Sequence, residues 1–248
     1  MLRLLCVTAH PDDEAGAFGG SLVLYRDRGV ETSVICLTAG TAARNRGTAR
    51  SNEELAELRR GEFAASCRML GVAHYEVLDY PDGKLDRTEF HTVTGELVRR
   101  MRQFCPHVVM TFGMDGGLTG HPDHAMAGVF TTMAFQWMRR ADRYPEQIEL
   151  GLPPYVAQKL YHLATHFTLP DFPAIAPPTC TARIVVGEER FQKKIEAFMQ
   201  HTTQAPLFGR LKKNIRNREP VEVFHLIGAA TPREAKLETD LFDGVGED

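Results

Sequence analysis

The sequence of 248 residues lacks an apolar run that approaches the roughly 18 residues needed to span a membrane. It also lacks an excess of either charge. The formal net charge is -3 at pH 7, which gives no indication of a nucleic acid or an anionic membrane as a partner. The apolar start, residues 1–8, is short and has no basic leader or cleavage site, so we interpret it as a strand rather than a signal peptide.

Cysteine is scarce and odd in number, with five residues scattered at positions 6, 36, 67, 105 and 180. An odd, scattered set argues against a disulfide framework, and four of the five lie in or beside apolar stretches. Hydrophobic residues make up 43% and charged residues 25%, as in an ordinary soluble globular protein. These features predict buried, reduced thiols in a cytoplasmic protein.

Strand-like and helix-like segments alternate through the first two-thirds of the chain. Strands are predicted at 2–8, 31–38, 74–78 and 107–112, and helices at 15–29, 51–70, 87–104 and 124–140. This alternation predicts an α/β fold with a Rossmann-like, mostly parallel sheet and helices on both faces. In such sheets, ligands bind beyond the carboxyl ends of the strands.

The last third of the chain is less regular. A Pro-rich stretch, 145–180, contains a strand-like segment at 157–165 and is a candidate for a lid or an interface between copies. Strands at 182–186 and 221–227 and helices at 188–200 and 205–217 complete the predicted core. We therefore expect one domain over residues 1–230, followed by a charged, loosely ordered C-terminal tail over 231–248.

The first chemically suggestive cluster is His10-Pro11-Asp12-Asp13-Glu14, directly after the first predicted strand. His10 and Asp13 are ordinary zinc ligands at a turn that can aim both side chains at one point. Asp12 would then be a spare carboxylate, as a general base for a zinc-bound water requires. On its own the string is equally consistent with a capped acidic helix start, because acidic side chains offset the helix dipole.

A second cluster, Gly120-His121-Pro122-Asp123-His124, repeats the His-Pro-Asp pattern after another predicted strand. Two such segments at neighbouring strand ends can converge in space. Either His121 or His124 could complete the metal site, and the other could donate a hydrogen bond to an anionic tetrahedral intermediate. Asp123 could orient one imidazole from behind. The pair of clusters favours a metal site over two capped loops.

Together, residues 9–14 and 121–124 resemble the paired signature of the LmbE-like, or PIG-L-like, zinc N-deacetylases. The resemblance extends from about residue 3 to 227. Its lesser matches are an R-x-x-E helix ending in L-G-V, a P-D-G-x-L turn, and a late K…H-x-S/T-Q segment, carried here by Arg59 with Glu62 and residues 70–72, by residues 81–85, and by Lys194 with residues 201–204.

The resemblance implies a hydrolase that removes N-acetyl groups from N-acetylglucosamine-type sugars and releases acetate and a free amine. It implies zinc on His10, Asp13 and His124, and Asp12 as the general base. It also implies that His121 stabilises the oxyanion and protonates the leaving amine. Iron(II) could fill the same His/Asp site in cells.

Further roles follow from the lesser matches. The resemblance implies that Asp123 pairs with a histidine, and that Arg59 and Asp82 hold the sugar. For His201, a helix-terminal cap and a pocket residue start as equal alternatives, and the resemblance favours substrate contact in the pocket. The expected partner is a small amino-sugar substrate. Oligomeric state is left open, and a homo-oligomer is compatible with the sequence.

The sequence departs from the family where many members carry T-x-G-E. Here the string is Thr38-Ala39-Gly40-Thr41, without the acidic residue. The following loop, 42–50, contains three arginines, at positions 44, 46 and 50. They could bind an acidic substituent of the substrate, although a solvated basic loop is the favoured interpretation.

Several alternatives remain beside the deacetylase hypothesis. A dinucleotide site is disfavoured, because residues 16–20 lack G-x-G-x-x-G and acidic residues occupy the turn. A second metal at His162, His166 and Asp171 is less favoured than a surface or pocket-lining role. The rival functions are a metal hydrolase of another amide or N-acyl substrate, and a catalytically silent binding module on the same fold.

Overall fold

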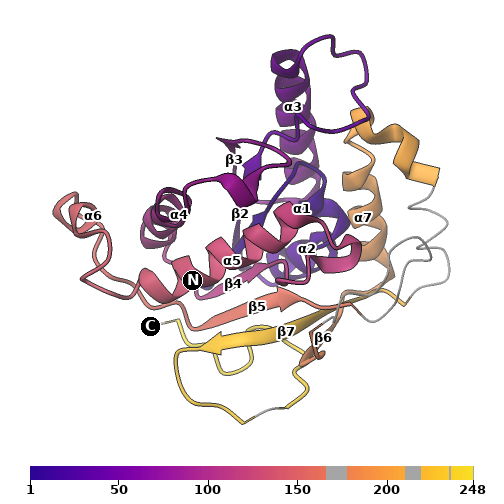
Figure 1. Cartoon of the computed structure of the whole chain (residues 1–248). Coiled ribbons are helices and arrows are strands. Elements are labelled where there is room, and N and C mark those ends of the chain that lie inside the picture. The colour runs from indigo at the N-terminus through magenta and orange to yellow at the C-terminus, as the bar shows by residue number, and fades with distance from the viewer. Residues whose placement is uncertain (166–177, 210–218, 235, 248) are drawn as a thin grey trace.

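A seven-stranded mixed sheet forms the centre of the protein (Figure 1). The structure is a computed structural model that describes residues 1–165, 178–209, 219–234 and 236–247. The strand order is β3-β2-β1-β4-β5-β7-β6. The strands are β1 (Arg3–Thr8), β2 (Glu31–Thr38), β3 (His74–Tyr80), β4 (Val108–Thr111), β5 (Lys159–Leu163), β6 (Ala182–Val185) and β7 (Val221–Ala229).

The five strands from β3 to β5 are parallel, as the alternation of elements predicts. β1 pairs with β2 on one side and β4 on the other, with Cys6 opposite both Val34 and Met110. β1 and β4 are buried almost throughout, because their near-continuous apolar sequence suits a strand that is covered on two faces. β7 runs antiparallel to both β5 and β6, and this reversal of direction is not apparent from the alternation of elements.

Helices cover both faces of the sheet. α2, α3 and α7 pack together on one face, and α4 and α5 pack together on the other (Figure 1). The α-helices are α1 (Asp13–Gly16), α2 (Gly19–Asp27), α3 (Asn52–Leu70), α4 (Phe90–Phe104), α5 (Pro122–Trp137), α6 (Pro145–Glu149) and α7 (Glu188–Phe198). Short 3₁₀ turns are η1 (Leu85–Arg87), η2 (Gly117–Thr119) and η3 (Thr202–Leu207).

The boundaries of α3 follow its sequence signals. Ser51 accepts a hydrogen bond from the backbone N–H of Glu54, and Gly71 ends the helix at a φ of 73°. The single helix predicted over 15–29 is instead two helices, α1 and α2, separated by Ala17 and Phe18. α1 lasts only four residues, so the chain changes direction directly behind the first His-Pro-Asp cluster. Of the helix predicted at 205–217, residues 210–217 lie outside the described residues.

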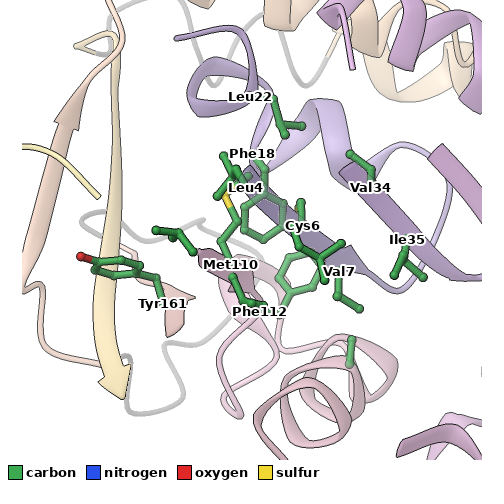
Figure 2. Packing of buried hydrophobic residues seen from close by; sticks show 14 of the residues in the cluster. Leu4, Cys6, Val7, Phe18, Leu22, Val34, Ile35, Met110, Phe112 and Tyr161 are labelled. Carbon is green, nitrogen blue, oxygen red and sulfur yellow. The ribbon is translucent and has the colours of Figure 1, made fainter. Parts of the chain in front are cut away.

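The core gathers around β1, β4 and the start of α2. Figure 2 shows Phe18, Cys6 and Met110 meeting there, and the Phe18 and Phe112 ring centroids are 5.2 Å apart. All five cysteines are free thiols and three are buried, which agrees with the prediction of unpaired cysteines. Within the described residues, no helix combines the length and apolarity that a membrane span requires.

The C-terminal segment after β7 packs onto the domain, although its charge predicts a loose tail. Leu241 is fully buried, and Glu238 forms a buried ion pair with Lys159 of β5 at 2.9 Å. The backbone of Arg183 donates to the carbonyl of Glu238. The prediction is wrong because a charged residue in this segment has a buried partner 79 positions earlier, which local composition cannot reveal.

Candidate active site

The two His-Pro-Asp clusters meet at the carboxyl ends of β1 and β4, which are neighbouring strands. The first cluster leads from β1 into α1, and the second leads into α5. His121 caps α5, because its Nδ1 accepts the backbone N–H of Asp123 at 3.1 Å and Pro122 occupies the first helical position. The sheet topology therefore brings together two segments that are more than 100 residues apart in the sequence.

Three donor atoms converge on one point between these segments. His10 Nδ1 lies 3.2 Å from His124 Nε2 and 3.5 Å from an Asp13 oxygen, and His124 Nε2 lies 3.2 Å from the other Asp13 oxygen. Ligands about 2.0–2.1 Å from a tetrahedral zinc are separated from one another by about 3.3 Å. The spacing and the donor types of these three residues therefore fit a zinc-type cation.

The charges around His10 also fit a cation. Four carboxylates, those of Asp12, Asp13, Asp82 and Asp123, lie around this histidine or next to it, and the guanidinium among them is that of Arg59. When the histidines are neutral, as metal binding requires, these groups leave an excess of three negative charges in a largely buried place. A divalent cation would offset most of it.

The opposite nitrogen of His10 has its own partners. Nε2 lies 3.1 Å from Asp82 Oδ1 and 3.2 Å from Asp123 Oδ2. These two carboxylates already accept backbone N–H groups, from Ala42 and from Gly83 respectively. On spacing alone, His10, Asp82 and Asp123 could also hold a metal. The two carboxylates fit better as hydrogen-bond acceptors that keep a proton on His10 Nε2 and leave Nδ1 free as a metal ligand.

His121 lies beside the three donor atoms, and on spacing alone its ring could bind a metal together with those of His10 and His124. Its ring centroid is 4.8 Å from that of His10 and 5.1 Å from that of His124. Burial, together with the neighbouring His10 and His124, lowers its pKa, so the ring is neutral near pH 7. Because Nδ1 accepts the N–H of Asp123, the proton resides on Nε2. His121 can therefore donate a hydrogen bond from Nε2 into the pocket that it lines.

Asp12 occupies a backbone conformation that an aspartate seldom adopts, with φ of 113°. Such a conformation costs about 1–2 kcal/mol and persists only where neighbours hold it. Here Arg59 donates to Asp12 Oδ2 at 3.1 Å and to the carbonyl of Pro11, while the backbone N–H of Asp12 donates to Glu14. Burial raises the pKa of Asp12 to about 6 against the opposing effect of Arg59.

Behind Asp12 lies a fully buried network that sequence analysis missed. One oxygen of Glu14 accepts from His201 Nε2 at 2.7 Å and from Ser66 Oγ at 2.5 Å, and its other oxygen accepts the backbone N–H of Asp12 at 2.9 Å. His201 is completely buried and does not line the pocket. The last acidic residue of the H-P-D-D-E string was the available signal, because a buried carboxylate requires a donor.

α3 connects the early and late parts of the signature. Arg59 and Glu62 lie one turn apart on it. Arg59 holds Asp12, and Glu62 accepts hydrogen bonds from both the backbone and the hydroxyl of Thr203. Gln204, the next residue, lines the pocket and donates to the carbonyl of Asn45. The R-x-x-E pattern therefore has a physical reason, since its two side chains fix segments on either side of the pocket.

A cavity of about 460 Å³ opens in front of the three donor atoms. Seven of the nine predicted site residues line it, and the two that do not are Asp123 and His201. Asp123 supports His10 from behind, and His201 supports Glu14. The wall residues that sequence analysis did not single out include Phe112, whose ring stacks on that of His124 with centroids 4.0 Å apart.

Residues 5–135, just over half of the chain, match the family profile described as PIG-L, GlcNAc-PI de-N-acetylase. The chain is a member of the PIG-L family. This confirms the resemblance inferred from the paired signature. The matched region extends from β1 through most of α5 and contains both His-Pro-Asp clusters.

Individual PIG-L relatives agree with this membership. The chain is 30% identical to a 1D-myo-inositol 2-acetamido-2-deoxy-alpha-D-glucopyranoside deacetylase of Actinosynnema mirum, over 98% of this chain and 97% of that protein. It is 32% identical to a mycothiol S-conjugate amidase of Streptomyces coelicolor, over 65% of this chain, and it spans 60% of that relative's length.

A solved structure shares the fold of this PIG-L protein. It is the N,N'-diacetylchitobiose deacetylase of Pyrococcus horikoshii, with a TM-score of 0.73 and 23% identity over 91% of this chain and 83% of that chain. This likeness confirms the predicted α/β architecture.

Proposed function

We propose that this protein is a metal-dependent hydrolase that removes the N-acetyl group from an N-acetylglucosamine-type sugar or glycoconjugate. The observation that carries the proposal is the convergence of His10 Nδ1, Asp13 and His124 Nε2, with Asp12 on one side and His121 on the other. The deacetylase relative that matches nearly the whole chain supports the sugar class.

His10, Asp13 and His124 would hold the cation, and their two nitrogens and one carboxylate favour zinc, with iron(II) as the alternative. A bound cation of this type polarises a carbonyl and lowers the pKa of water. The chain's own contribution is to fix the three donors. Asp82 and Asp123 orient His10, and Phe112 holds the ring of His124 by stacking.

Asp12 and His121 would move the protons. Asp12 accepts a proton from the attacking water, whose oxygen forms a bond to the acyl carbon. His121 donates a hydrogen bond from Nε2 to the carbonyl oxygen as negative charge develops there. When the C–N bond breaks, its electron pair stays on nitrogen, which takes up the proton that Asp12 accepted from the water. The products are a carboxylate and a free amine.

The other predicted residues would act on either side of these groups. Arg59 and Asp82 line the pocket on the Asp12 side, where the sugar would lie. Most of the donors on Arg59 are already committed to Asp12 and the carbonyls of Pro11 and Gly40. We therefore assign Arg59 mainly to positioning the base, and His201 to the same task through Glu14.

The test combines a substrate screen with metal removal. Purified protein is incubated with N-acetylglucosaminides that differ in aglycone, and acetate and free amine are quantified together. We expect the two products in equal amounts, loss of turnover after chelation, and its return on adding zinc.

Two outcomes would favour the rival functions. Release of an amine from other N-acyl compounds but from no amino sugar would indicate a different amide hydrolase, an outcome consistent with the amidase relative. Tight zinc binding without hydrolysis of any N-acyl compound would indicate a binding module.

A further inference from the structure

The pocket has two chemically different ends. One end is polar and contains the side chains of Asp12, Arg59 and Asp82. The other end is lined by large apolar side chains. They are Phe112, Leu163, Phe198, Leu207, Val221 and Val223. The donor atoms of His10, Asp13 and His124 border both sets of side chains, since Asp12 contacts Arg59 and the ring of Phe112 stacks on that of His124.

The apolar end is built by elements remote from the signature motifs. Val221 and Val223 come from β7, Leu163 from β5 and Phe198 from α7. These four side chains are buried, with at most 9% of each exposed. A wall assembled from three separate elements is part of the packed fold.

Small residues keep the passage to this end open. Gly16 and Ala17 line the pocket at the end of α1. A Cβ atom on Gly16 would lie 3.2 Å from the ring of Phe198, which is closer than ordinary contact. A side chain at position 16 would therefore press on Phe198 and narrow the passage.

The charged residues at this end offer little to a polar ligand. The Nζ atom of Lys194 donates to Glu222 at 2.5 Å and to the carbonyl of Ala17 at 3.2 Å. The carboxylate of Glu222 also accepts the backbone N–H groups of Gly20 and Ser21. Because these charges are already paired, sugar hydroxyls placed here would lose hydrogen bonds to water without gaining good replacements.

The geometry of an amide decides which part of the substrate faces each end. A trans amide directs its acyl chain and its nitrogen substituent away from each other across the C–N bond. With the sugar at the polar end and the carbonyl at the metal cluster, the acyl chain enters the apolar end. A single acetyl methyl group would leave most of the apolar wall without contact.

We propose that the preferred substrate of this enzyme carries a straight N-acyl chain of four or more carbons rather than an acetyl group. This inference rests on the proposed deacetylase function and deepens it by naming the acyl group that the site prefers. The reaction is unchanged. Water adds its oxygen to the acyl carbon, the C–N bond breaks, and a fatty carboxylate leaves in place of acetate.

The test is a matrix of synthetic glucosaminides incubated with the zinc-loaded full-length protein. N-acetyl, N-butyryl and N-hexanoyl derivatives are each prepared as the methyl and the octyl glycoside, and amine release is measured. Burying one methylene changes an equilibrium by roughly fourfold. The butyryl chain has two more methylenes than acetyl, so we expect kcat/KM to be about fifteenfold higher for the butyryl than for the acetyl methyl glycoside.

Variants test whether the apolar end determines this preference. Val223→Phe places a larger side chain in the apolar end and leaves less space for the acyl chain. The ratio of butyryl to acetyl kcat/KM should then fall to about one. Val185→Phe makes the same change at an exposed position of β6, 58% accessible, and should leave the ratio intact. Should Val223→Phe fail to fold, Leu207→Trp narrows the same end from a residue that is 38% exposed.

The outcomes separate this inference from the proposed function. Cleavage of the acetyl compounds with turnover that falls as the acyl chain lengthens would overturn the inference and leave the proposed function intact. An increase in kcat/KM that depends on the octyl aglycone and not on the length of the acyl chain would also overturn the inference, because the aglycone would then occupy the apolar end. Amine release from none of the compounds would overturn both.

Discussion

Asp12 and Asp13 are adjacent carboxylates with opposite tasks, and their surroundings account for the difference. Asp13 faces His10 and His124, and although burial opposes them, these two partners hold its pKa well below the usual range. It therefore stays ionised, as a metal ligand must. Asp12 is turned away by its positive φ toward Arg59, and burial raises its pKa to about 6. A base near neutral pH is the more effective for accepting and then releasing a proton.

At the residue scale, His201 tests the buried support behind Asp12. His201→Leu removes the donor to Glu14, so the carboxylate that holds the backbone N–H of Asp12 loses a buried partner. We expect kcat to fall by about ten- to a hundredfold with unchanged zinc content. His201→Gln keeps a donor and should recover much of the rate. Equal rates for the wild type and a folded His201→Leu protein would show that the network has no part in positioning the base.

His162 gives a prediction for stability against pH. It is buried on β5, donates to or accepts from Thr132 Oγ1 at 2.8 Å, and faces His225 on β7. Burial, with His225, lowers its pKa from 6.5 to about 4. Between these values the unfolded chain binds the proton and the folded chain does not, so stability falls as pH falls.

The His162 contribution amounts to roughly 3 kcal/mol over that range. Urea unfolding of the wild type and of His162→Gln between pH 7 and 4 measures it. The variant should show a shallower decline in the free energy of unfolding. Parallel declines would indicate that His162 is protonated in the folded protein.

At the scale of elements, the sequence predicts most boundaries where local signals are strong. α3 begins at the Ser51 cap and ends at Gly71, as expected. The prediction of one helix over 15–29 fails because of a contact that is distant in sequence. The apolar pattern continues through Ala17 and Phe18, but Phe18 leaves the helix to pack against Phe112 of the neighbouring loop. That contact spans 94 positions, so no pattern within the segment predicts it.

One arginine holds the backbone of residues 138–144, which follow α5, in place. Arg102 of α4 is 2% exposed and donates to four backbone carbonyls, those of residues 138, 140, 143 and 144, and to Gln147. Arg102→Met keeps much of the volume but leaves several acceptors unpaired. We expect a loss of about 2–4 kcal/mol of unfolding free energy.

Arg99→Met is the matched control for this prediction, because Arg99 lies on the same helix and pairs with Glu96 near the surface. A surface pair of this type contributes about 0–1 kcal/mol. Chemical unfolding of both variants measures the difference. A loss for Arg102→Met no larger than that for Arg99→Met would contradict the structural role of the buried guanidinium.

At the scale of the whole molecule, the site lies where the strand order reverses. The connection after β1 leads to β2 on one side of it, whereas β4 lies on its other side. Because the connections after β1 and β4 lead in opposite directions, a crevice forms between them. The sequence predicts this arrangement, because both His-Pro-Asp clusters follow recognisable strands. It predicts neither the apolar end of the pocket nor the docked C-terminal segment. β7, α7 and Glu238 reach these places through contacts distant in sequence and without a motif.

The central claim is a division of labour, with His10, Asp13 and His124 holding a metal and Asp12 left free as the base. Zinc content and amine release, measured on the same preparations of Asp12→Ala and His124→Ala, test it most directly. The account predicts that Asp12→Ala keeps stoichiometric zinc but loses at least about a hundredfold in turnover, whereas His124→Ala loses both. Full turnover by Asp12→Ala, or stoichiometric zinc in His124→Ala, would contradict it.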